Sequence, residues 1–158
     1  MRDFTQPARA TGPGVVADGR LSTSTVLVID PAGEAPHDEI PATWRPLADH
    51  MRIVWLRVPA APSWKSTVDK VLTRHRDDTS TVLDVVTSGP VAADVVDLVR
   101  AHAGLVRSVL LVDPEVEVDE PFARVVLRSH SGHFPAPLPL GHPDVVSGVV
   151  SALDELNP

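Results

Sequence analysis

Apolar residues gather in five short runs along the chain, and segments with a helical spacing of apolar residues separate them. The runs are rich in β-branched residues and mostly continuous rather than alternating: Thr25–Asp30, Met51–Val58, Thr81–Thr87, Ser108–Asp113 and Ala123–Ser129. Continuous apolar runs of this length are typical of parallel strands that are covered on both faces. The pattern therefore predicts a buried, mostly parallel sheet of about five strands.

Four segments between or after these runs place apolar residues three and four positions apart, as one face of a helix requires. They are Pro41–His50, Ser63–Arg76, Val91–Ala103 and Pro143–Leu156. Strands that alternate with helices indicate a parallel sheet with right-handed crossovers. We expect a three-layer, doubly wound α/β fold whose five strands, numbered in chain order, lie in the order 2-1-3-4-5.

Residues 1–24 have a different pattern, because turn-forming residues recur there among small polar ones. These are Pro7, Gly12, Pro13, Gly14 and Gly19. Such a segment predicts a flexible arm or a loose hairpin, and it leaves open whether this part of the chain adds an edge strand. A chain of 158 residues normally forms one domain, so residues 25–158 are expected to form a single α/β domain.

The composition narrows the classes of partner and of chemistry. The chain has no cysteine, which excludes disulfides, thiolate metal sites and a cysteine nucleophile. Its net charge of −7 argues against nucleic acid and anionic membranes as partners. No segment resembles a signal peptide or reaches the roughly 20 apolar residues of a membrane helix. We therefore expect a cytoplasmic protein.

The carboxyl ends of the predicted strands are the expected place for a site, because ligands of doubly wound sheets bind there. The candidate cleft residues are Asp30, Pro31, Ala32, Thr87, Gly89, Pro90 and His130. A phosphate-binding loop needs several glycines after the first strand, whereas only Gly33 is present. Thr87 stands where a phosphoryl-accepting receiver domain would need an aspartate. We therefore expect no cofactor, and a small-molecule ligand or a protein partner at this edge.

Histidines gather in a proline-rich stretch near the C-terminus. His130 and His133 form an H-x-x-H pair, and His142 follows them. A zinc site needs three or four ligands held by supporting hydrogen bonds, which loop histidines in such a stretch rarely provide. The sequence therefore predicts no metal site.

Over about residues 25–156, the order of local features resembles that of a known enzyme family. The stretches concerned include TVLVIDPAG (25–33), TVLDVVTSGPVAADVVDLVRAHAGLVRSVLLVDPE (81–115) and SGHFP (131–135). They resemble the strand before the oxyanion loop, the nucleophile strand with the helix and strand that follow it, and the histidine loop of the α/β-hydrolase superfamily. The resemblance implies a serine esterase or thioesterase with Ser88 as nucleophile, His133 as base and Asp113 as acid.

The nucleophile turn departs from the family pattern G-x-S-x-G, because this chain has VTSGP at 86–90. If Ser88 is the nucleophile, bulky Val86 stands where the sharp turn needs a small residue. Pro90 would also lack an N–H close to the developing oxyanion.

A second register follows from the end of the next helix. The ungapped resemblance of AHAGLVRSVLLVDP (101–114) puts Gly89 in the nucleophile position. The Ser88 register would turn Asp94 and Asp97 inward, and an unpaired buried carboxylate costs several kcal/mol. We therefore favour the register with Gly89, which has no side chain that could attack a substrate.

The oxyanion side is also altered, because Asp30 and Pro31 stand where the family has His-Gly. A carboxylate there would repel an oxyanion, whereas catalysis needs fixed donors. We interpret the chain as an α/β-hydrolase-like pseudoenzyme, a non-catalytic module that binds a small molecule or a protein. The alternative is an active serine hydrolase that uses Ser88, His133 and Asp113. An exposed edge of the parallel sheet would also favour a homo-oligomer.

Overall fold

The computed structural model describes residues 14–19, 24–32, 39–76, 81–102, 104–129 and 137–157. The described residues form six strands: β1 Val15–Asp18, β2 Ser24–Asp30, β3 Arg52–Arg57, β4 Val82–Ser88, β5 Ser108–Val112 and β6 Ala123–Leu127. The same residues form four α-helices: α1 Arg45–Ala48, α2 Trp64–Arg76, α3 Ala92–Arg100 and α4 Pro143–Leu156. They also form short 3-10 turns at Ala42–Trp44, Val58–Ala60 and Gly89–Val91.

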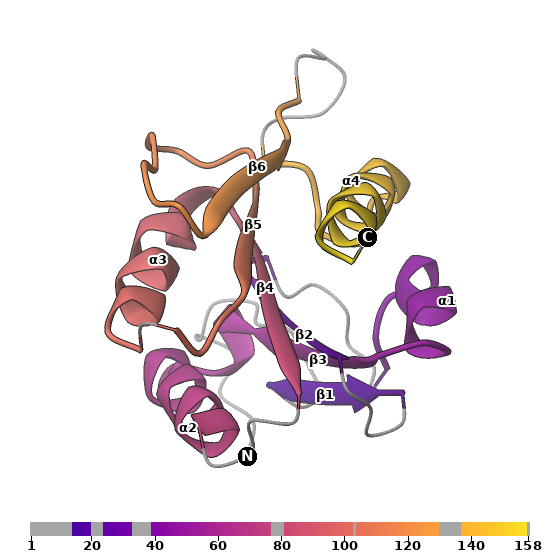
Figure 1. Cartoon of the computed structure of the whole chain (residues 1–158). Coiled ribbons are helices and arrows are strands. Elements are labelled where there is room, and N and C mark those ends of the chain that lie inside the picture. The colour runs from indigo at the N-terminus through magenta and orange to yellow at the C-terminus, as the bar shows by residue number, and fades with distance from the viewer. Residues whose placement is uncertain are drawn as a thin grey trace, which may run out of the picture.

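The six described strands lie in one sheet in the order β1-β3-β2-β4-β5-β6. Every neighbouring pair is parallel except β1 and β3, which run antiparallel. Counted by the five predicted strands, the parallel part has the order 2-1-3-4-5. Figure 1 shows α2 and α3 on one face of the sheet and α1 and α4 on the other. The α/β class and the mostly parallel sheet are therefore confirmed.

Strand β1 adds an edge strand that the hydrophobic pattern had left open, within the segment predicted as an arm or hairpin. Its four residues pair with β3, from Val15 opposite Leu56 to Asp18 opposite Ile53. Gly19 ends the strand with a φ of +88°, and a Cβ there would lie 2.3 Å from the carbonyl oxygen of Met51. Only glycine fits this close approach without strain.

The sheet separates two apolar clusters, which explains why the strand runs are continuous. The cluster under α1 and α4 takes Val26 and Val28 from β2. The cluster under α2 and α3 takes Leu27 and Ile29 from the same strand. Successive side chains of a strand point to opposite faces, so a strand covered on both faces must be apolar at every position.

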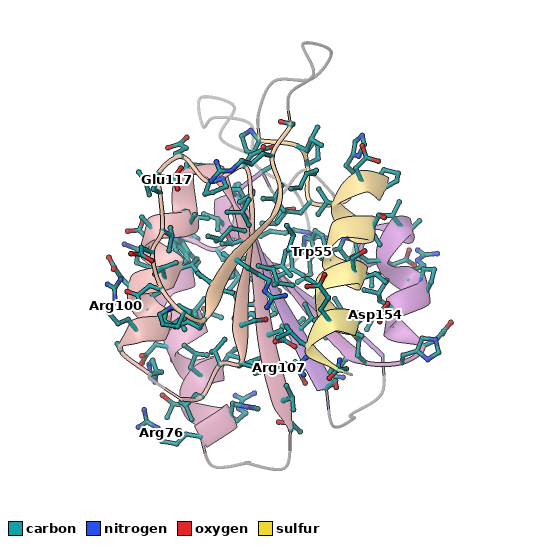
Figure 2. The ribbon with its side chains drawn as sticks, turned by 45° about the horizontal axis from the view of Figure 1, so that its top comes forward. Trp55, Arg76, Arg100, Arg107, Glu117 and Asp154 are labelled. Atoms are coloured by element: carbon teal, nitrogen blue, oxygen red, sulfur yellow. The ribbon has the colours of Figure 1, made fainter. Side chains whose placement is uncertain are left out.

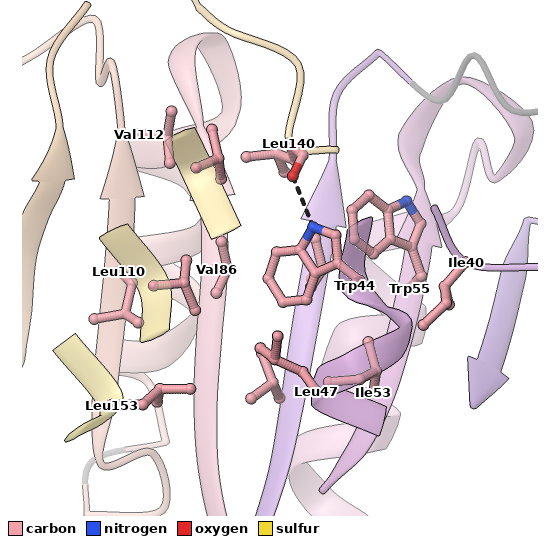
Figure 3. Packing of buried hydrophobic residues seen from close by; sticks show 14 of the residues in the cluster. Ile40, Trp44, Leu47, Ile53, Trp55, Val86, Leu110, Val112, Leu140 and Leu153 are labelled. Carbon is pink, nitrogen blue, oxygen red and sulfur yellow. Dashed lines mark hydrogen bonds between the residues drawn. The ribbon is translucent and has the colours of Figure 1, made fainter. Parts of the chain in front are cut away.

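The cluster under α1 and α4 is organised around two tryptophans (Figure 3). The rings of Trp44 and Trp55 meet edge to face, with centroids 5.3 Å apart and an interplanar angle of 80°. The indole Nε1 of Trp44 donates to the carbonyl oxygen of Leu140 at 2.8 Å. This buried bond fixes the segment before α4 against the residues that begin α1.

Two of the predicted helices are shorter in the structure. The segment Pro41–His50 holds a 3-10 turn and only the four α-helical residues of α1, and α3 ends at Arg100 rather than Ala103. Helix α4 has the predicted bounds, and the His142 ring caps it by accepting a hydrogen bond from the N–H of Asp144 at 3.1 Å. In the described part of the chain, every helix is too short or too polar to cross a membrane.

A polar cluster around Arg107, which Figure 2 labels, ties the amino ends of β4 and β5 to the end of α4. The Asp84 carboxylate, 1% exposed, accepts from Arg107 Nε at 3.1 Å, from Arg107 Nη2 at 2.7 Å and from Ser108 Oγ at 2.6 Å. The same guanidinium donates through Nη1 to Asn157 Oδ1 at 2.6 Å. The buried carboxylate is therefore matched by a charge and by hydrogen bonds, as burial demands.

Candidate functional site

The turn between β4 and α3 is made at Gly89 rather than at Ser88. Ser88 has the extended backbone of a strand, with φ −147° and ψ 163°, and it is only 1% exposed. Gly89 follows with a φ of +47°, in the region that favours glycine. The sharp change of direction that presents a nucleophile in an α/β-hydrolase therefore falls on a residue without a side chain.

The space in front of Gly89 is already filled. A Cβ at this position would lie 2.7 Å from Cγ of Pro137 and 3.3 Å from its Cβ. Contacts below 3 Å force atoms to move, so a serine at position 89 does not fit against Pro137 as it stands. Pro137, which precedes α4, therefore occupies the space in front of this turn.

Of the other candidates beside this turn, Thr87 has a structural partner and Pro90 is exposed. Thr87 is fully buried, and its hydroxyl donates to the carbonyl oxygen of Ile29 at 3.0 Å. Pro90 is exposed on the 3-10 turn that follows. The hydroxyl of Thr87 thus joins β4 to β2 instead of facing a cleft.

Asp30 ends β2 and uses both carboxylate oxygens inside the protein. Its Oδ1 accepts from the N–H of Ala32 at 3.0 Å, which makes a turn through the partly exposed Pro31. Its Oδ2 accepts from Trp55 Nε1 at 3.1 Å. Asp30 therefore holds the turn after β2 and one member of the tryptophan pair in place.

Asp113 follows β5 and holds the two ends of the segment that would carry the catalytic histidine. Its carboxylate accepts from Ser129 N at 2.6 Å, from Ser129 Oγ at 2.9 Å and from Leu138 N at 3.1 Å. Burial by itself raises the pKa of Asp113, but the hydrogen bonds from Ser129 and Leu138 and the charge of Arg128 together lower it below the ordinary 3.8. Asp113 has a φ of +44°, which an aspartate tolerates better than most residues.

The bonds to Asp113 also explain why β6 is shorter than predicted. The predicted strand reaches Ser129, whereas β6 ends at Leu127. Ser129 gives both its N–H and its hydroxyl to Asp113, so its backbone leaves the ladder with β5.

The predicted histidines His130 and His133 lie outside the described residues. Three described histidines have other partners: His75 contacts Thr81, His102 contacts Asp69 and Arg76, and His142 caps α4. None of these contacts is with Ser88. The structure therefore brings Ser88 and Asp113 to neighbouring strand ends, with Ser88 beside Val112, and leaves the third member of the predicted triad undescribed.

A hollow of about 430 Å³ lies beside β1 and was not predicted. The residues described along it are Ala17, Asp18, Glu39, Ile40 and Arg45. Two of them, Arg45 and Glu39, form an exposed ion pair with each other. No pattern in the sequence signals this hollow, because its first two residues fall in the segment predicted as an arm. Within the described ranges, no three His, Asp or Glu side chains gather as metal ligands.

No family model, curated protein or solved structure matches this chain. The function must therefore be inferred from the carboxyl edge itself. There, the side chains of Asp30, Thr87 and Asp113 serve as acceptors and donors for the protein's own backbone and side chains. These three side chains therefore hold segments of the protein together at the carboxyl edge.

Proposed function

We propose that this protein is an α/β-hydrolase-like pseudoenzyme, a non-catalytic module that binds a partner, with a protein favoured over a small molecule. The observation that carries the proposal is Gly89, whose φ of +47° makes the sharp turn and whose missing side chain is replaced by Pro137. A nucleophile at the turn needs both a side chain and open space, and this position has neither.

The hydrolase-like part of the proposal rests on topology and resemblance together. The strand order β3-β2-β4-β5-β6 is the order expected for such a core, and it supports the family resemblance of the sequence. A fold supports many functions, so the fold alone does not decide activity.

The preference for a protein partner rests on the hydrogen bonds that the polar side chains at the carboxyl edge already make within the chain. A small-molecule site usually offers a few convergent polar groups that remain available to the ligand. Both oxygens of Asp30 and of Asp113 accept hydrogen bonds from within the chain, and the Thr87 hydroxyl is committed to Ile29. A surface of this kind suits contact with another protein better than capture of a polar ligand.

A fluorophosphonate probe tests the proposal directly, because it reacts covalently with activated serines. We expect no adduct by intact-protein mass spectrometry after incubation of the whole chain with an excess of probe. Turnover of p-nitrophenyl esters and of acyl thioesters should not exceed that of the Ser88→Ala variant.

The matched control is an active serine esterase treated in the same tube. One probe adduct per chain that disappears in Ser88→Ala would overturn the proposal and restore the alternative, an esterase or thioesterase with Ser88, His133 and Asp113. A His133→Ala variant would then separate a true triad from a merely reactive serine, because loss of the base should also abolish labelling.

A further inference from the structure

Strand β6 forms one edge of the sheet, and no other strand of the described residues pairs with its outer side. Its neighbour β5 is buried at every position, whereas Arg124 and Val125 of β6 are exposed, Val125 by 40%. An exposed edge with an apolar side chain is a template for pairing with another strand. The edge therefore points to a partner that contributes a strand.

Backbone geometry shows which groups of β6 face outward. Val109 of β5 lies opposite Ala123, and its N–H donates to the carbonyl oxygen of Phe122 at 2.8 Å. In a parallel ladder, alternate residues turn both their N–H and their C=O to the same neighbour. Phe122 and Arg124 therefore face β5. The N–H of Ala123 donates to the carbonyl oxygen of Glu120 at 3.0 Å, and beyond the register shift that follows Leu111, the carbonyl oxygen of Leu127 accepts from the N–H of Asp113 at 2.9 Å. Val125, between them, turns both its N–H and its C=O to the free edge.

We propose that two copies of this chain associate by pairing their β6 strands antiparallel, with Val125 of each copy opposite Val125 of the other. A two-fold axis through this pair joins the two sheets into one and makes the contact self-complementary. The two exposed valines then pack against each other on one face of the joined sheet. This pairing goes beyond the proposed function, because it does not depend on whether the turn at Gly89 is catalytic.

The side chains around Val125 select the register. Centring the pair on Arg124 would put two guanidinium groups opposite each other, and like charges at that distance are destabilising. Centring it on Ala123 would put Val125 opposite Pro121, which has no N–H to donate. Centring it on Val125 keeps the two Arg124 side chains from lying opposite each other. The N–H of each Val125 then donates to the carbonyl oxygen of the other, which gives two hydrogen bonds.

Charges at the two ends of β6 favour the antiparallel direction. Glu117 and Asp119 stand in the connection before the strand, and Arg128 follows it; all three are exposed (Figure 2 labels Glu117). Within one copy, Arg128 and Glu117 form a loose pair with nitrogen and oxygen 3.4 Å apart. An antiparallel pair brings the basic end of each strand to the acidic approach of the other. A parallel pair would instead place Arg128 beside Arg128.

A single cysteine provides the sharpest test of this register, because the chain has none of its own. In a hydrogen-bonded antiparallel pair, the two Cα atoms are about 5.5 Å apart, within the range of a disulfide. We expect Val125→Cys to form a disulfide-linked dimer under mild oxidation at least about tenfold faster than a freely diffusing thiol. The matched control is Val15→Cys on β1, because Val15 is also 40% exposed on an edge strand.

Proline at the same two positions tests the hydrogen bonds. Val15 and Val125 both turn their N–H outward. On β1, the carbonyl oxygen of Gly14 accepts from Arg57 N, so Gly14 faces β3 and the next residue, Val15, turns its backbone groups away from β3. By sedimentation velocity, we expect the natural chain to approach twice its mass of 16.9 kDa with rising concentration. Val125→Pro should raise the dissociation constant about tenfold or more, and Val15→Pro should leave it unchanged.

Charge exchange keeps the test decisive if a proline variant fails to fold. Arg128→Glu and Asp119→Lys should each weaken self-association, because each puts like charges together in its homodimer. A mixture of the two variants should recover dimer, because the carboxylate introduced in one copy then meets the ammonium group introduced in the other. Circular dichroism before each run ensures that only folded chains are compared.

Three outcomes overturn the pairing: a monomer at every accessible concentration, equal cross-linking of the two cysteine variants, or no recovery in the mixture. None of them bears on the fluorophosphonate test, so failure of the dimer and failure of the proposed function are distinguishable. Dimerisation that Val125→Pro leaves intact would move the interface to another surface and would also overturn this assignment.

Discussion

The two ends of the sheet each hold an aspartate that ties separate segments together, but they do so with different partners. At the amino ends, Asp84 is buried and accepts from the guanidinium of Arg107 and the hydroxyl of Ser108. At the carboxyl ends, Asp113 is partly exposed and accepts from neutral donors of Ser129 and Leu138. The charge of Asp84 is thus balanced by a guanidinium, whereas the carboxylate of Asp113 is held by backbone N–H groups and a hydroxyl.

The difference shows how the carboxyl edge is used in this chain. In doubly wound sheets, ligands bind beyond the carboxyl ends of the strands. Here Asp113 has the same kind of role as Asp84, since it fastens the segment before α4 instead of orienting a histidine in any described contact. At the carboxyl edge, where a site is expected, Asp113 therefore holds chain segments together, as Asp84 does at the amino edge.

The largest expected effect is at the amino end. Asp84→Ala removes the buried acceptor of Arg107 and Ser108 and should destabilise the protein by about 3–5 kcal/mol. The guanidinium of Arg107, which is partly buried, loses its charge partner, and the buried hydroxyl of Ser108 loses its acceptor. Urea denaturation followed by circular dichroism measures the loss. The control Asp97→Ala removes an exposed ion pair with Arg100 and should cost about 0–1 kcal/mol. Equal losses in both variants would show that the amino end is not a special support.

The next effect is at the carboxyl end. Asp113→Ala removes an acceptor of three hydrogen bonds and places alanine at a φ of +44°, so we expect a loss of about 2–4 kcal/mol. Asp113→Asn keeps one acceptor oxygen and should lose about half as much. If Asp113 were instead a catalytic acid with no holding role, neither variant would change the free energy of unfolding by more than about 0.5 kcal/mol.

A third change tests the filled turn. Gly89→Ala should cost about 1–3 kcal/mol, because it adds backbone strain and a clash with Pro137. Pro137→Ala removes the ring atom that lies nearest to the added Cβ. The double variant should therefore be more stable than the sum of the two single losses predicts. Strict additivity would mean that the turn is open and that Pro137 does not occupy it.

The smallest effect is a dependence on pH. Because the folded pKa of Asp113 is lowered, its contribution is fully present above its ordinary value of 3.8 and is lost as the pH falls through the lower folded value. The stability difference between the natural chain and Asp113→Asn should therefore be constant near neutrality and shrink below about pH 4. A difference that instead grew on acidification would contradict the lowered pKa.

The fold was predictable where apolar runs are continuous, because strands covered on both faces leave a plain signal. Strand β1 was not, because VVAD is too short to be distinguished from a turn and its pairing with β3 is non-local. The role of Asp84 could not be predicted for a related reason, because its partners are distant in sequence. Only the register that sets Asp84 beside Ser108 shows how a charged residue is accommodated in a buried strand.

The candidate site was predictable only in part. The spacing of the helix that follows β4 indicated that Gly89 rather than Ser88 makes the turn, and Gly89 has the positive φ. No pattern could indicate that Pro137 fills the space before it, because that contact joins residues far apart in sequence. The partners of Asp30 and Asp113 could not be predicted either, because every residue except proline has a backbone N–H and the sequence does not show which one donates.

The tryptophan pair has a practical consequence for following how this molecule unfolds. The chain has three tryptophans and no tyrosine, so its intrinsic fluorescence comes from the indoles alone. Trp44 and Trp55 belong to the cluster under α1 and α4, and Trp64 belongs to the cluster on the opposite face. A Trp64→Phe variant would therefore report optically on one half of the core. A Trp44→Phe, Trp55→Phe double variant would report on the other.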